Sequence, residues 1–214
     1  MSNILLVTSS PRGSASISSK VAIELADKLK AALPGSKVVH HDLVAQPLPH
    51  IVPDYASGIY TPPEVRTAAQ AELVAVSDSV VDELLAADHV ILAMGMVNFS
   101  IPSTLKSWID HISRAGRTFR YDANGPEGLV KGKKVYVVIA SGGVYSEGPA
   151  AAADFAGPYL KQVLAFNGMT DVEVIRIEGT ALGEDSVKKG LADASDRTDA
   201  ISADLAEPQV AQAA

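Results

Sequence analysis

The sequence predicts an α/β fold built on a parallel sheet, and two observations carry this prediction. Five apolar runs recur along the chain, and they are continuous rather than alternating, as in strands that are covered on both faces. The segments between these runs are each long enough for a helix, so we expect right-handed crossovers and parallel strands. No repeat or second-domain boundary is visible, and we expect one domain over residues 1–206 and a frayed tail over 207–214.

The predicted elements alternate along the chain. Strands are expected at residues 3–8, 37–41, 89–94, 134–140 and 171–177. Helices are expected from near Ser16 to Pro34 and at 61–87, 103–115, 150–166 and 184–205. Thr61 and Glu64 have the spacing of a capping box, with proline in the first turn. Segment 42–63 has no periodicity and contains five prolines, so we expect a long functional or interfacial loop there, and segment 117–132 is expected to be irregular.

Five strands in this order fit a flavodoxin-like three-layer sandwich, with strand order 2-1-3-4-5, better than a six-stranded dinucleotide-binding fold. In that order the chain adds strands first on one side of the first strand and then on the other, so the switch point lies between the first and third strands. Ligands bind there, at the carboxyl ends of the strands. Three polar loops rich in glycine or serine leave those ends, at residues 9–19, 95–102 and 141–145. We expect these three loops to converge on one ligand.

The composition excludes several classes of function. The net charge is −7 and no basic stripe is present, so neither nucleic acid nor an anionic membrane is an expected partner. The longest apolar run, 90–97, is far shorter than the roughly 18 residues of a membrane span, and the first residues lack the pattern of a secretory signal. The chain has no cysteine, and its five histidines lack metal-ligand spacing, so we expect a cytoplasmic protein without a metal site.

The first loop favours a terminal phosphate. It contains neither the glycine fingerprint of dinucleotide-binding folds nor the lysine motif of P-loops. It holds a cluster of serines at a helix start, where hydroxyls and backbone amides can bind free phosphate oxygens. The alternative is that Ser16 only caps the helix and the other serines form a turn. Arg12 either adds a charge to the phosphate site or points to solvent.

The second and third loops favour a flavin ring. The amide of Asn98 and the flat face of Phe99 suit the edge and plane of an isoalloxazine ring. Gly142 and Gly143 can bring backbone amides to the pyrimidine end of such a ring, where they would stabilise the negative charge of its reduced form. The alternatives are a buried Phe99 beside a turn-forming Asn98, and a Gly-Gly pair that is only a turn.

Several blocks of the sequence resemble one enzyme family. They are Ser9-Ser10, Met-Val-Asn-Phe at 96–99, Arg-Ala-Gly-Arg-Thr-Phe-Arg-Tyr at 114–121, Asn-Gly-Pro-Glu-Gly-Leu-Val at 124–130, and Gly142-Gly143. In content and spacing they resemble the FMN-dependent NADH azoreductases, which are also described as NAD(P)H:quinone oxidoreductases of the flavodoxin-like fold. The similarity covers about residues 3–202, and block 118–130 is its most specific part, because an α/β fold does not require it.

The resemblance implies a homodimer with one tightly bound FMN per subunit and the active site at the subunit interface. It implies no dedicated catalytic side chain: a hydride from NAD(P)H would pass through N5 of FMN to a quinone or azo compound in a ping-pong reaction. The implied phosphate ligands are Ser10, Ser16, Ile17 and Ser18; the ring ligands are Met96, Val97, Asn98, Phe99, Ala140, Ser141, Gly142 and Gly143; the pocket wall is Phe119, Tyr121 and Phe166.

The sequence departs from the family pattern at the pocket. Gly95 and Val97 stand where the family often has proline and tyrosine, and Ala140-Ser141 where many members have serine and arginine. The substrate range and the choice between NADH and NADPH therefore stay open. Two other functions also stay open: a non-catalytic flavin-binding partner protein, and a nitro or flavin reductase on the same scaffold.

Overall fold

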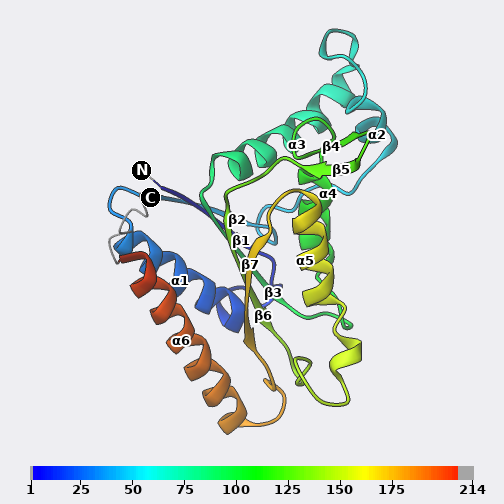
Figure 1. The fold of residues 1–214 in the computed structure, drawn as a ribbon. Helices are drawn as coiled ribbons and strands as arrows, with labels where there is room; N and C mark the ends of the chain where they lie inside the picture. Colours follow the sequence, from blue (N-terminus) through cyan, green and yellow to red (C-terminus); the bar gives the residue numbers. More distant parts are fainter. Residues whose placement is uncertain (1, 207–214) are drawn as a thin grey trace.

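The computed structural model describes residues 2–206 as three layers around a parallel sheet (Figure 1). Its sheet has the order β2-β1-β3-β6-β7. The strands are β1 (Asn3–Thr8), β2 (Lys37–Asp42), β3 (His89–Gly95), β6 (Lys134–Ala140) and β7 (Asp171–Ile177). Since β4 and β5 form a separate two-stranded sheet, this is the predicted 2-1-3-4-5 order of the five main strands. The flavodoxin-like architecture is confirmed.

Two groups of helices cover the sheet (Figure 1). Apolar residues of α1 (Ile17–Ala32) and α6 (Glu184–Ala206) pack on one face, and those of α3 (Ala68–Ala86), α4 (Ser103–Ile112) and α5 (Ala156–Phe166) on the other. The short helix α2 (Pro53–Gly58) and the 3-10 turns η1 (Gly13–Ala15), η2 (Pro63–Val65) and η3 (Ala151–Ala153) lie in the connections. Residues 207–214, predicted as a tail, lie outside the described residues.

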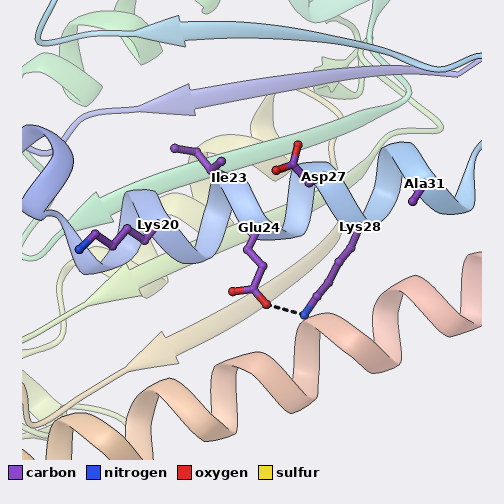
Figure 2. Close-up of a pocket in the computed structure, with 6 residues that line it drawn as sticks. All are labelled: Lys20, Ile23, Glu24, Asp27, Lys28 and Ala31. Carbon is purple, nitrogen blue, oxygen red and sulfur yellow. Dashed lines mark ion pairs between the residues drawn. The ribbon is translucent and has the colours of Figure 1, made fainter.

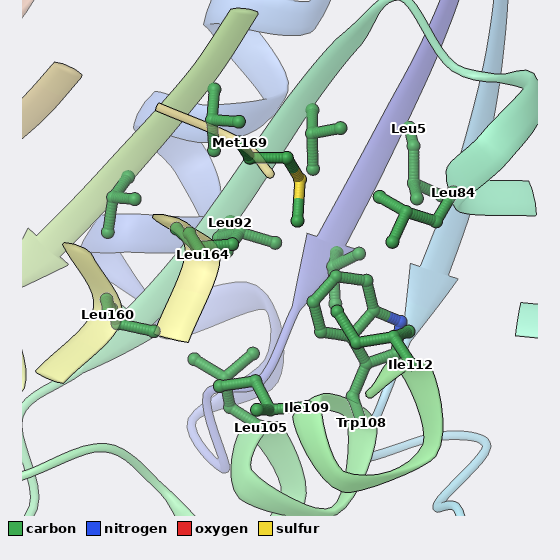
Figure 3. Close-up of a cluster of buried hydrophobic side chains, with 14 of the residues drawn as sticks. Leu5, Leu84, Leu92, Leu105, Trp108, Ile109, Ile112, Leu160, Leu164 and Met169 are labelled. Carbon is green, nitrogen blue, oxygen red and sulfur yellow. The ribbon is translucent and has the colours of Figure 1, made fainter. Parts of the chain in front are cut away.

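The continuous apolar strands serve two cores at once. In β1, Ile4 and Leu6 face the α1 and α6 side, whereas Leu5 and Val7 face the α3, α4 and α5 side. Figure 3 shows the second core, where Trp108 of α4 points toward the sheet. Trp108 is fully buried there, so it is a packing residue. Burial on both faces explains why these strands show no alternation of apolar and polar residues.

Helix α3 begins at Ala68, so the expected start at Thr61 was wrong. The capping box is formed instead by Thr67, whose Oγ1 accepts from the N–H of Gln70 at 3.2 Å, while the Gln70 side chain accepts from the N–H of Thr67 at 3.0 Å. The Thr61 hydroxyl donates to the Ser57 carbonyl, which closes the preceding helix. Arg66 donates to the Gly58 and Thr61 carbonyls and holds an extended backbone between the two segments.

Two further expectations were wrong in detail. The segment expected to be irregular contains the hairpin of β4 (Phe119–Asp122) and β5 (Gly125–Gly128). The helix expected from residue 150 begins only at Ala156. The cause is Asp154, whose carboxylate accepts from the N–H groups of Ala156 and Gly157 and so defines the start of α5.

The capping box gives a stability prediction. We expect Thr67→Ala to lower the free energy of unfolding by about 1 kcal/mol, because the first turn of α3 then has an unsatisfied N–H group. Urea denaturation of both proteins measures the difference. Thr61→Ala, which leaves this capping box intact, is the control, and an equal loss in the two variants would contradict the assignment.

Burial of His111 gives a pH prediction. Its Nε2–H donates to the Pro49 carbonyl at 2.8 Å, and its buried Nδ1 has no partner among residues 2–206. Burial lowers the pKa of His111, and burial also lowers the pKa of His89. Below about pH 6.5 the unfolded chain binds protons that the folded chain does not, so stability is full at neutral pH and falls as the pH drops.

We therefore expect the free energy of unfolding to decrease from about pH 7 to about pH 5. Urea denaturation across this range measures the slope. His111→Gln should flatten the slope in part and not completely, because His89 still has a pKa lowered by burial. An unchanged slope in the variant would contradict this account of His111.

Candidate active site

The three polar loops converge on one cavity of about 360 Å³ at the carboxyl edge of the sheet. Nine of the predicted cofactor ligands line it: Ser10, Ser16, Ile17, Ser18, Met96, Val97, Ala140, Ser141 and Gly142. Pro11, Arg12, Gly95, Thr180 and Ala181 complete the lining. Asn98, Phe99 and Gly143 belong to the same loops but do not line this cavity.

The serine end of the cavity offers hydrogen-bond donors at the start of α1. Ser16 caps the helix, since its Oγ accepts from the N–H of Ser19 at 3.2 Å, and it also lies 3.2 Å from the Ser18 hydroxyl. Ser16 therefore caps the helix, as the alternative interpretation expected, and also lines the cavity. The N–H groups of the first turn point outward with the positive end of the helix dipole. Arg12 is exposed at the rim and forms no ion pair within the described chain. This end suits an anion.

A strained turn stands beside the cavity. Val97 and Ser100 exchange two backbone hydrogen bonds, each of 2.9 Å, around Asn98 and Phe99. Both central residues have positive φ, 46° for Asn98 and 70° for Phe99, as in a type I′ turn. Such a conformation is unusual for a bulky residue and is concentrated at functional sites. Phe99 is 49% exposed, so the expected alternative of a buried Phe99 was wrong.

The loop after β7 arranges the amides of the Gly-Gly turn. The carbonyls of Ser141, Gly142 and Gly143 accept from Thr180 at 3.0 Å, Ala181 at 3.0 Å and Gly179 at 3.1 Å, respectively. These bonds tie the carbonyls to the 179–181 loop, whereas the N–H groups of Gly142 and Gly143 form no hydrogen bond among residues 2–206. Sequence reasoning missed Thr180 and Ala181, although the rule that ligands bind at carboxyl ends of strands applies to the fifth strand as well.

The three aromatic residues of the predicted wall lie together, but away from this cavity. The ring centroid of Phe119 is 4.6 Å from that of Phe166 and 5.8 Å from that of Tyr121. Phe155, just before α5, donates its N–H to the Phe99 carbonyl, whereas Phe166 is the last residue of that helix. Eleven helical residues separate these points by about 16 Å. The aromatic cluster therefore does not cover the cavity of its own chain.

A larger hollow of about 540 Å³ lies on the outer face of α1 (Figure 2). Lys20, Ile23, Glu24, Asp27, Lys28 and Ala31 line it, and Figure 2 marks the ion pair between Glu24 and Lys28, 2.7 Å long. These side chains come from one helix, and no loop from a strand end reaches them. Exposed ion pairs and a partly exposed Ile23 are ordinary for a helix surface, so this hollow is not the candidate site.

The converging cavity fits FMN. Its lining contains hydroxyls, backbone amides and one arginine but no carboxylate, which suits a phosphate of about two negative charges. Met96 and Val97 add apolar surface for a flat ring. Over the described range 2–206, no group of acidic, histidine or cysteine side chains could hold a metal, and no helix is long and apolar enough to cross a membrane.

Comparisons with known proteins agree with this fit. A family model described as "Flavodoxin-like fold" matches residues 2–201. An FMN-dependent NADH:quinone oxidoreductase of Mesorhizobium japonicum is 62% identical over 99% of this chain and 100% of its own length. A protein of the same name from Agrobacterium fabrum is 53% identical over 94% of this chain and 98% of its own.

Solved structures give the same result. The azoreductase of Bacillus anthracis strain Sterne is 32% identical, covers 94% of this chain and 99% of its own, and has a TM-score of 0.87. A second azoreductase from Bacillus anthracis, solved with FMN, shares the fold with a TM-score of 0.88 at 24% identity, covering 97% of this chain and 100% of its own. The chain is thus an oxidoreductase that belongs to the flavodoxin-like family of FMN-dependent NADH:quinone oxidoreductases and azoreductases.

Proposed function

We propose that this chain binds FMN in the converging cavity and uses NADH or NADPH to reduce quinones or azo compounds by a ping-pong reaction. The observation that carries the proposal is the cavity itself. Its serine end offers hydrogen-bond donors for a phosphate, and the unbonded N–H groups of Gly142 and Gly143 belong to one of the loops that converge on it. The names of the relatives support the choice of cofactor and substrates. We further propose that residues 1–206 form a single FMN-binding domain and that the protein is cytoplasmic.

We propose that these residues bind FMN, orient its ring and tune its reduction potential. Ser10, Ser16, Ser18 and the first-turn amides hold the phosphate, with Arg12 at the rim. The amides of Gly142 and Gly143 face the pyrimidine end of the ring and stabilise negative charge there. FMN, when bound, supplies the redox chemistry, so no side chain of this chain needs to act as acid or base and protons come from water.

The proposed assembly is a homodimer in which each subunit completes the active site of the other. The aromatic cluster of Phe119, Tyr121 and Phe166 lies too far along α5 to cover the ring site of its own chain. Tyr121 is 70% exposed, which leaves it available to a second copy. An aromatic slot over the ring is what flat donors and acceptors need, and a two-fold partner would supply it.

Steady-state kinetics test the proposal. Oxidation of NADH and of NADPH is followed with benzoquinone as acceptor, with and without added FMN, and an azo dye, a nitroaromatic and free flavin replace benzoquinone in parallel. We expect turnover that requires FMN and is fastest with the quinone or the azo dye. Fastest turnover with the nitroaromatic or free flavin would favour the reductase alternative. Bound FMN without turnover would favour the non-catalytic partner protein.

A further inference from the structure

Segment 145–155 makes two contacts with the strained turn at Asn98 and Phe99, here called its supports. The N–H of Phe155 donates to the Phe99 carbonyl at 3.0 Å. The ring of Tyr145 meets the Phe99 ring edge to face, with centroids 6.1 Å apart. Since Phe99 is half exposed, burial contributes little to fixing this conformation. Besides the two hydrogen bonds between Val97 and Ser100, these contacts from segment 145–155 therefore help to keep the left-handed backbone of the turn.

Two carboxylates fix the segment that carries these supports. Oε1 of Glu178, the residue after β7, accepts from the N–H groups of Tyr145 at 2.8 Å and Ser146 at 2.9 Å. Its Oε2 accepts from the Ser146 hydroxyl. Oδ1 of Asp154 accepts from the N–H groups of Ala156 at 3.0 Å and Gly157 at 2.9 Å, immediately after Phe155.

Arg176 of β7 joins the two carboxylates. Its Nη2 lies 2.5 Å from Oδ2 of Asp154, and its Nη1 lies 3.5 Å from Oε1 of Glu178. Burial by itself raises the pKa of Asp154, but hydrogen bonds from Gly157 and Arg176, together with the Arg176 charge, bring that pKa below its usual value. The Asp154 carboxylate is thus held as a charged acceptor by an arginine on the edge strand β7.

Gly157 allows α5 to approach this cluster. A Cβ at residue 157 would lie 2.7 Å from Nη2 of Arg176 and 2.9 Å from Oδ2 of Asp154. A methyl group there would displace the guanidinium, the carboxylate or both. The ion pair can therefore be disturbed without changing any charge.

We propose that Asp154, Arg176 and Glu178, here called the clamp, are positioning residues that hold Tyr145 and Phe155 against Phe99 and so keep the ring-binding turn in its binding-competent conformation. The proposal rests on the proposed function, because it takes the 97–100 turn as part of the flavin site. None of the three clamp residues lines the cavity. The clamp acts through the Phe155 hydrogen bond and the Tyr145 ring contact to Phe99.

Three variants test the clamp against a control on the same strand. Glu178→Gln removes the carboxylate, Gly157→Ala displaces the ion pair with all charges kept, and Arg176→Lys keeps the charge but loses the planar fork. Glu173→Gln is the control, because Glu173 also lies on β7 and also pairs with an arginine, Arg197, but contacts neither loop. Each apoprotein is titrated with FMN, and the melting temperature and the visible spectrum of the bound flavin are recorded.

We expect Glu178→Gln and Gly157→Ala to bind FMN about tenfold more weakly, since apparent affinity falls with the fraction of molecules in the competent conformation. Their bound-flavin spectra should differ from the wild-type spectrum, and Arg176→Lys should lie between. Glu173→Gln should match the wild type in affinity and spectrum.

The proposal is overturned if the clamp variants match Glu173→Gln in both affinity and spectrum, or if they lower only the melting temperature. If one variant fails to fold, the others decide, and Arg176→Lys is the mildest change. A wild-type protein that does not bind FMN would defeat the proposed function instead, so the two failures are distinguishable.

Discussion

Replacing Ser18 with aspartate should weaken FMN binding by at least about 100-fold. Like unit charges about 4 Å apart near a protein surface repel by about 4 kcal/mol, and each ~1.4 kcal/mol changes an affinity tenfold. Ser18 is buried, lines the cavity and lies in the first turn of α1. A carboxylate there opposes the phosphate directly. Fluorescence titration of the apoprotein with FMN measures the loss.

Ser18→Ala is the matched control for this prediction. It removes the hydroxyl without adding charge, and we expect a loss of tenfold or less, because a neutral hydrogen bond contributes about 0.5–1.5 kcal/mol. The melting temperature of both apoproteins shows whether the fold is kept. Equal FMN affinities of the aspartate and alanine variants would mean that the phosphate does not bind at the serine end.

Gly128→Ala should give the largest loss of stability and should impair turnover while leaving FMN binding intact. A Cβ at residue 128 would lie 2.1 Å from the Gly168 nitrogen and 2.4 Å from its Cα. Backbone cannot yield as a side chain can, so the hairpin must move away from the end of α5. We expect a destabilisation of about 1–3 kcal/mol, which is about 2–4 °C of melting temperature per kcal/mol for a chain of this size.

The functional part of this prediction follows from the aromatic cluster. Phe119 is on the hairpin and Phe166 ends α5, so moving the hairpin separates their rings. The KM for the acceptor should rise while the Kd for FMN stays unchanged. Gly132→Ala is the control: no atom lies within 4 Å of its Cβ, and its φ of 74° adds a left-handed backbone strain that Gly128 does not have. Equal destabilisation in the two variants would contradict the steric explanation.

The sheet was predictable because its strands obey a local rule. Buried parallel strands such as 134–140 need apolar residues on both faces, and this leaves a continuous run in the sequence. Helix starts were less predictable. Thr61 and Thr67 both have a glutamate or glutamine three residues later, so the pattern alone does not show which threonine caps α3. In the structure the Thr61 hydroxyl donates to the Ser57 carbonyl, and Thr67 forms the cap.

The site was predictable in its loops but not in its arrangement. The serine cluster and Gly142 line the cavity because strand ends meet at one edge of the sheet. Thr180 and Ala181 carry no motif, and their role arises from hydrogen bonds to residues about 40 positions away in sequence, so composition could not indicate them. The distance of Phe119 and Phe166 from the cavity depends on the direction of α5, which a residue pattern does not contain.

A visible absorption spectrum of the protein during anaerobic reduction is the most direct test of the central claim. The protein is reconstituted with FMN, freed of excess cofactor and treated with one equivalent of NADH, followed by benzoquinone, without oxygen. We predict that the flavin band of the bound cofactor bleaches with NADH and returns with the quinone. A protein that stays colourless after reconstitution, or a bound flavin that NADH and NADPH both fail to bleach, would contradict the account.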